Sequence, residues 1–351
     1  MTLLRELSAS FEARGRSARA CRKAVPVCCR GVPKWKAIAN LARAAALAAA
    51  LAPFSASRAE STLPRATPSA DSSWREGLRF QLAVEGAHDV SFEDADVSWL
   101  RTSGLIALQG PLSERWSAGV SVSAELLSPE VDGDASFLAA TAGGGDALRD
   151  LFESNLRAGA RMMIRQRWSL GAEGYLTAKL EPGADFGDGL KGGTLLGFGY
   201  RPSDAFDLMA GVKLGSRLDR PGVHAWPMLR MEWQITDRLE LDLRNANLRL
   251  VFELRDGLEL FGFGGARSDR YRLERRALGP LASEPGTLGI RDATVGAGLS
   301  WIPNEHLRVV GTLGTVVWQK LSVNDADADR IESRTSDGAA PIASLRIQAR
   351  F

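Results

Sequence analysis

The chain has 351 residues, with 44 Lys and Arg against 42 Asp and Glu, three cysteines and a formal net charge of +2. These values exclude a chain of extreme charge, and no run of basic and aromatic residues indicates a nucleic-acid partner. Composition alone would also fit a soluble enzyme, so the class of protein must come from the order of the residues along the chain.

The first 59 residues have the organisation of a secretory signal. A basic region precedes a Leu- and Ala-rich run at 41–52, and the small residues Ser57 and Ala59 follow. This order predicts cleavage after Ala59, with residues 1–32 as an extension that contributes nothing to the fold. A membrane helix is the alternative, but the run is too short to span a bilayer comfortably and Arg43 interrupts it.

Cleavage at that point changes the charge of the mature chain. It removes 11 of the 44 basic residues and only 2 of the 42 acidic ones, so the mature chain is net negative. All three cysteines (Cys21, Cys28 and Cys29) leave with the signal. We therefore expect neither disulfide bonds nor thiol catalysis in the mature protein.

After a polar segment at 60–73, one pattern runs from residue 74 to the end of the chain. Apolar side chains alternate with polar ones, most regularly at 116–126, where Trp, Ala, Val and Leu alternate with Ser, Gly and Glu. This is the period of a strand with one apolar and one polar face. We expect about 14 strands, with 12 as the alternative count, at 77–86, 97–108, 114–126, 153–165, 167–180, 192–201, 206–217, 226–235, 238–244, 248–255, 258–268, 289–301, 306–320 and 341–351.

Strands of this kind form either a soluble sandwich or a membrane barrel, and the connections favour the barrel. Even-numbered connections have five residues or fewer, whereas most odd-numbered ones are long, as at 127–152, 269–288 and 321–340. Long loops at one end and short turns at the other are typical of outer-membrane barrels. The sequence therefore predicts an all-β fold, an antiparallel transmembrane β-barrel over residues 74–351 in the bacterial outer membrane.

Tryptophan positions support this interpretation. Four tryptophans fall at the short-turn ends of their strands, and three (Trp99, Trp226 and Trp318) fall at the long-loop ends. Two belts of amphipathic rings are expected at the two membrane interfaces, although core tryptophans remain an alternative.

The polar faces carry charges of both signs, which are inexpensive in a lumen and costly against lipid. We expect the following residues to line the lumen: Arg157, Arg161, Arg165, Arg230, Glu232, Glu240, Asp242, Arg244, Arg249, Glu253 and Arg255.

Two segments allow other interpretations. Residues 147–165 could form an amphipathic helix, because three arginines recur four apart. Residues 239–255 could form one long strand. An even strand count and alternating loops favour a strand from about 153 and a break at 245–247.

The last segment, 341–351, alternates as a closing strand and ends on Phe351. A terminal Phe of this kind resembles the signal that barrel insertion machinery reads.

Other motifs in the C-terminal half are Pro227, the turn at 233–238, the Leu-rich hairpin 239–254, Tyr271-Arg272-Leu273 and a Gly-rich strand at 296–301. Together they resemble a family of uncharacterised bacterial outer-membrane β-barrel proteins, although Ala246 replaces a usual proline. The resemblance implies the barrel and no chemistry.

Sites for catalysis or metal binding are weakly indicated. The three histidines lie in or beside connections, and none has an adjacent serine that would suggest a barrel lipase. Gly262–Gly265 lies within a strand pattern, so curvature of the barrel explains it better than phosphate binding. Asp325, Asp327 and Asp329 alternate as calcium ligands do, but the remaining features of an EF-hand loop are absent.

These observations predict a protein that is not an enzyme and that binds no cofactor or metal. We expect a passive pore for small polar solutes, with outer-membrane lipid and the insertion machinery as partners. The alternative is a closed structural or surface-interaction barrel whose charges pair inside the lumen.

Overall fold

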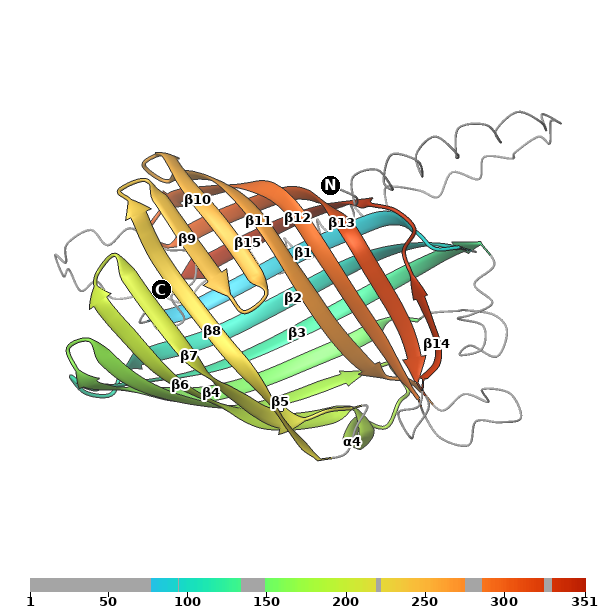
Figure 1. Cartoon of the computed structure of the whole chain (residues 1–351), viewed down its shortest axis with the longest axis horizontal. Helices are drawn as coiled ribbons and strands as arrows, with labels where there is room; N and C mark the ends of the chain where they lie inside the picture. The colour runs from blue at the N-terminus through green and yellow to red at the C-terminus, as the bar shows by residue number, and fades with distance from the viewer. Residues whose placement is uncertain (1–76, 94, 134–148, 219–221, 275–285, 325–329) are drawn as a thin grey trace, which may run out of the picture. The chain divides into compact units, whose positions relative to one another are not determined.

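The computed structural model describes residues 77–93, 95–133, 149–218, 222–274, 286–324 and 330–351. The expected signal, the polar segment 60–73 and the aspartates at 325–329 lie outside these ranges. Within them the chain forms one antiparallel sheet that closes on itself (Figure 1). No helix in this part of the chain is long and apolar enough to cross a membrane.

The first seven strands alternate in direction around the barrel. They are β1 (Gly77–Ser91), β2 (Ala95–Pro111), β3 (Trp116–Gly133), β4 (Leu151–Arg165), β5 (Trp168–Leu180), β6 (Leu190–Ser203) and β7 (Phe206–Ser216). The others are β8 (Val223–Thr236), β9 (Leu239–Arg244), β10 (Asn247–Arg255), β11 (Leu258–Arg272), β12 (Thr287–Asn304), β13 (Leu307–Asn324), β14 (Arg330–Thr335) and β15 (Ala340–Arg350).

The wall of the barrel has 14 strands, β1 to β13 and β15, which confirms the expected count. Strand β14 pairs only with the far part of β13 and extends it outside the wall. The sequence pattern missed this strand, and it also missed the one-turn helix α4 (Phe186–Gly189) between β5 and β6. The expected breaks hold: residues 151–165 form a strand rather than a helix, and β9 and β10 are separate.

The first and last strands of the wall close the barrel, as the sequence predicts. Strand β15 pairs with β13 on one side and with β1 on the other, from Arg79 opposite Arg350 to Ala87 opposite Ile342. Leu78 and Phe351 exchange two backbone hydrogen bonds of 3.0 and 2.9 Å. The apolar sheet therefore has no open edge at the seam between the first and last strands.

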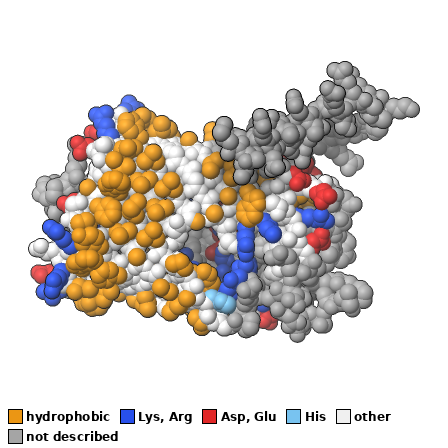
Figure 2. Space-filling view, viewed as in Figure 1, with side chains coloured by type: hydrophobic (Ala, Val, Ile, Leu, Met, Phe, Trp, Pro, Cys, Tyr) orange, Lys and Arg blue, Asp and Glu red, His pale blue; other side chains and the backbone are white. Residues whose placement is uncertain are grey.

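The outer surface of the wall carries a band of apolar side chains, which Figure 2 shows across the face that includes β8 to β10. Leu299 and Leu248, for example, are 45% and 47% exposed. Charged side chains flank the band at the barrel end. A closed antiparallel barrel with an apolar exterior is the β-structure that spans lipid, because strand pairing satisfies the backbone groups that face the bilayer. The protein is thus a transmembrane barrel of the bacterial outer membrane.

Tryptophans mark one edge of this band as expected, but the other edge only in part. Near the short turns the exposed tryptophans are Trp116, Trp168, Trp233 and Trp301. Trp318 is exposed near the opposite end of the barrel, where the long loops lie. The prediction was wrong for Trp99, which is buried in the interior, and for Trp226, which lines an internal cavity. Both occupy the inward-facing parity of their strands, so position along a strand alone could not assign them to lipid.

Replacement of Phe351 by serine is expected to lower the amount of folded barrel in the outer membrane several-fold. The ring packs edge to face against Phe80 at a centroid distance of 6.1 Å, whereas the seam itself is held by backbone bonds. The loss should therefore come mainly from assembly. Heat-modifiable protein in membrane fractions gives the measurement, with Phe351→Tyr as the aromatic control; normal levels of the serine variant would contradict the assembly role.

Candidate functional site

The interior of the barrel is closed along part of its far end, the end opposite the short turns, by an apolar cluster that we call the outer core. Its members come from inward positions of β1–β4, β11–β13 and β15, together with Phe92 and Leu273 from connections. Tyr271, Leu288 and Val316 are fully buried in it. The barrel is therefore not an open cylinder, because side chains fill this part of the lumen as they fill a soluble core.

A group of charged residues next to the outer core spans the lumen, and we call it the transverse network. Arg101 on β2 binds Glu85 and Glu125 at 3.0 and 2.9 Å. Arg267 on β11 reaches across to the same Glu125 at 2.7 Å and also pairs with Asp269. Glu125 lies on β3, which is not a neighbour of β11 in the sheet, so the pair between Arg267 and Glu125 crosses the interior.

The network continues to a third part of the wall. The Nζ atom of Lys179 on β5 lies 2.5 Å from both Glu153 on β4 and Asp269 on β11. Beyond this point β5 and β11 meet directly, since Leu180 bridges Arg272 and the N–H of Glu181 donates to the Arg272 carbonyl at 2.8 Å. Strand β11 therefore divides the interior into two chambers.

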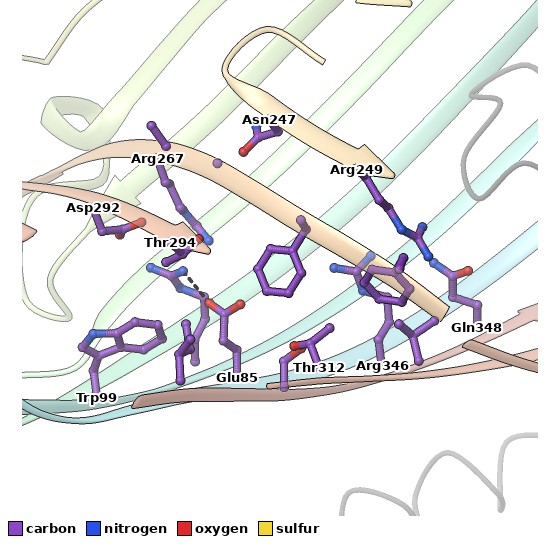
Figure 3. A pocket seen from close by; sticks show the side chains of 18 of the residues that line it. Glu85, Trp99, Asn247, Arg249, Arg267, Asp292, Thr294, Thr312, Arg346 and Gln348 are labelled. Atoms are coloured by element: carbon purple, nitrogen blue, oxygen red, sulfur yellow. Dashed lines mark hydrogen bonds and ion pairs between the residues drawn. The ribbon is translucent and has the colours of Figure 1, made fainter. Parts of the chain in front are cut away.

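The first, which we call the arginine chamber, has a volume of about 300 Å³ (Figure 3). Arg308 pairs there with Glu259, and Arg249 stacks on the Phe261 ring at 3.8 Å from its centroid. Within the described residues Arg346 forms no ion pair, and it faces the chamber. The charged residues that line the chamber are Glu85, Arg101, Arg249, Arg267, Asp292, Arg308 and Arg346.

The second, which we call the lysine chamber, has a volume of about 470 Å³ and lies between β4–β8 and β11. The Lys213 ammonium lies 4.3 Å from the centroid of the Tyr175 ring. In the part of the chain that the structure describes, neither Lys191 nor Lys213 has a carboxylate partner. The charged residues that line the chamber are Glu153, Arg157, Lys179, Lys191, Lys213, Arg217, Arg267, Asp269 and Arg270.

Basic residues thus outnumber acidic ones in both chambers, five to two and seven to two. Some of these cations are neutralised by carboxylates just behind the lining, as Arg308 is by Glu259. The remaining positive charge contrasts with the net negative charge expected for the mature chain. The linings of both chambers therefore carry an excess of basic side chains.

The residues that the sequence placed in the lumen fall into three groups. Arg157 lines the lysine chamber and Arg249 the arginine chamber. A second group forms a paired cluster nearer the short turns: Arg244 binds Asp242 at 3.0 Å and Glu232 at 3.2 Å. The paired members of this group are Arg161, Arg230, Glu232, Asp242 and Arg244, and Glu240 lies beside them on the strand of Asp242. Arg165, Glu253 and Arg255 occupy the strand ends beside the turns.

Sequence reasoning missed the residues of the transverse network, although an available signal could have found some of them. Glu85, Glu125 and Lys179 occupy polar positions of regular alternation. Arg101 was harder to assign, because Val97 and Trp99 make the inward face of β2 apolar as well. No group of three or more potential metal ligands occurs among the described residues.

Comparisons with known proteins were made for sequence and for structure. No protein-family model matches the sequence, and no curated protein matches it.

Solved outer-membrane channels resemble the barrel. An outer membrane channel from Pseudomonas putida F1 is 12% identical with a TM-score of 0.42, over 82% of this chain and all of that one. The Ralstonia pickettii toluene transporter TbuX is 13% identical with a TM-score of 0.41, over 80% and 90%. The P. putida toluene transporter TodX is 11% identical with a TM-score of 0.40, and the match covers 80% of this chain and 91% of that one. These resemblances are too distant to indicate a substrate.

Proposed function

We propose that the protein is an outer-membrane channel for small anionic solutes. The observation that carries the proposal is the excess of Lys and Arg around both chambers, with Lys191, Lys213 and Arg346 facing the lumen without a described carboxylate partner. Basic side chains along a pore raise the local concentration of anions and exclude cations. The volumes of about 470 and 300 Å³ are of the size that holds small molecules.

Liposome swelling with solutes of similar size and different charge tests this function. Glucuronate should enter several-fold faster than glucose, and glucosamine should enter more slowly than glucose, because the chamber charge acts on each in the opposite sense. Exchanging Lys191 and Lys213 for glutamate should reduce or reverse this order.

The matched control changes two cations on the outside of the wall. Arg291 and Lys320 face each other across β12 and β13 on the outward side. Replacing both by glutamate alters the total charge by the same amount without touching a chamber, so the order of entry should not change. Equal entry of the three solutes in the wild-type protein would contradict the proposal.

A closed barrel is the second candidate, and one observation favours it. The outer core and the transverse network obstruct the lumen on the side of β11–β13, β15 and β1–β4. A closed barrel predicts that no solute enters faster than into protein-free liposomes. Such a result in preparations with correctly folded protein would replace the channel by this candidate.

A further inference from the structure

The wall of the barrel is interrupted between β8 and β11. The hairpin β9–β10 is much shorter than its two neighbours, so it fills only the part of the gap nearer the short turns (Figure 1). Strand β9 pairs with β8 only from Arg230 to Thr236, and β10 pairs with β11 only as far as Gly265. Within the described part of the chain, residues 223–229 of β8 and 267–271 of β11 therefore have a strand neighbour on one side only. We call this interruption the lateral window.

The tip of the β9–β10 hairpin forms the near rim of the window, on the side of the short turns. Asn245 has a positive φ of 54°, a conformation that asparagine tolerates better than most residues. Its N–H donates to the Leu229 carbonyl at 2.7 Å, and its Oδ1 accepts from the Leu229 N–H at 3.0 Å. Ala246 accepts a bond from the Ala266 N–H. These bonds satisfy the last paired groups of β8 and β11 and end the sheet there.

The far rim is formed where β11 meets other segments. The Arg272 guanidinium donates to the carbonyls of Asp188 and Leu218 at 3.3 and 3.2 Å, and its own carbonyl accepts from Glu181. Among the described residues, these contacts bound the window at the end opposite the hairpin tip. At about 3.3 Å per residue its β8 side is roughly 20 Å long.

The direction of the Leu229 backbone shows which groups of β8 face the window. Since Leu229 directs its N–H and C=O toward the hairpin, residues two and four before it direct theirs into the window. One of these is Pro227, which has no N–H to leave unpaired. Free strand edges at membrane depth are tolerated where they line a hydrated cavity.

The window leads into the lysine chamber. The chamber is lined by Arg267 and Asp269, which face inward on β11, and also by Ser268 and Arg270, which alternate with them on the other face of the strand. Because four consecutive residues of β11 line the chamber, the chamber reaches the edge of this strand at the window. Figure 2 shows the corresponding hollow, which lies between the hydrophobic band and a strip of Lys and Arg side chains.

The rim has two chemical halves. Ala225, Pro227, Leu229 and Ala246 are exposed on the side of the apolar band, whereas Arg270 and the chamber lysines lie beyond and behind them. We propose that the lateral window admits an anionic amphiphile from the outer leaflet, with its charged head in the lysine chamber and its apolar tail along the apolar rim. This proposal extends the proposed function, since it assigns the lysine chamber a side entrance and a class of ligand.

Binding of dodecyl phosphate to the full protein in a neutral detergent, followed by native mass spectrometry, tests the proposal. We expect saturable binding of one molecule. Replacing Lys191 and Lys213 by methionine should weaken it tenfold or more, which is about 1.4 kcal/mol per tenfold. The outward pair Arg291→Met and Lys320→Met should bind as the wild type does. Ethyl phosphate should bind at least tenfold more weakly, and binding equal to that of dodecyl phosphate would overturn the role of the tail.

A second experiment tests the entrance itself. A bulky maleimide attached at Ser268→Cys stands in the window, whereas the same label at Ser154→Cys stands on β4, which is paired on both sides at that position. The first label should slow dodecyl phosphate binding several-fold and the second should not. Equal rates would overturn the window.

Liposome swelling of the same proteins separates this inference from the proposed function. Anion-selective entry without dodecyl phosphate binding would refute the window and leave the channel intact. Binding without solute entry would refute the channel and leave the window intact.

Discussion

Replacing Asp269 by leucine is expected to lower the free energy of unfolding by about 3–5 kcal/mol, because the change leaves buried cations without their shared partner. Asp269 is 6% exposed and joins Lys179 on β5 to Arg267 on its own strand, with Arg101 at 4.0 Å. No other carboxylate in the transverse network contacts all three cations in the described structure. Loss of this residue should therefore loosen the contact between β11 and the opposite wall.

Urea titration of the barrel in detergent, monitored by the mobility of unboiled protein, measures this effect. Glu93→Leu is the control, because Glu93 pairs with Arg334 at the surface and is 73% exposed as a side chain. Its loss should cost less than about 1 kcal/mol. A change of similar small size for Asp269→Leu would show that the transverse network does not stabilise the barrel.

Replacing Trp99 by alanine is expected to increase the conductance of single channels roughly twofold or more, since a constriction limits flow through a pore. The ring is 7% exposed, lies in the outer core and also lines the arginine chamber, with the Arg101 guanidinium 4.8 Å from its centroid. Its removal should open a path from that chamber toward the far end of the barrel. Stability should fall by about 3–5 kcal/mol, as for other large-to-small changes in a core.

Trp301→Ala provides the matched control for this prediction. Trp301 is 54% exposed on the outer surface and borders no chamber. Its replacement removes the same ring without opening the lumen, so conductance should not change. An unchanged conductance in Trp99→Ala together with the expected loss of stability would show that the outer core is not the barrier to passage.

Much of the barrel could be predicted because alternation reports a wall with lipid on one side and water on the other. That condition holds at 116–126, where the pattern is regular and β3 forms as expected. It fails at 97–101, because the inward residues Val97 and Trp99 belong to the outer core. Both faces are apolar there, so period two disappears although the strand continues.

The candidate site was less accessible to sequence reasoning for a related reason. Alternation shows that Lys179 faces inward, whereas the expected strand ends at 268 and leaves Asp269 in a connection, although β11 continues to Arg272. The pattern also cannot show that these two residues, 90 positions apart, meet across the lumen. The lateral window depends on strand length and register. The sequence indicated a break at 245–247, yet only the observed pairing shows that β8 and β11 continue past the hairpin with no described strand between them.

The central claim is that the lumen conducts and favours anions. Its most direct test is the reversal potential of single channels in a planar bilayer under a potassium chloride gradient. The proposed function predicts discrete current steps with a reversal potential shifted toward the chloride equilibrium potential. A shift toward the potassium equilibrium potential would contradict the assignment of charge selectivity, and the absence of current steps with folded protein would show that the barrel is closed.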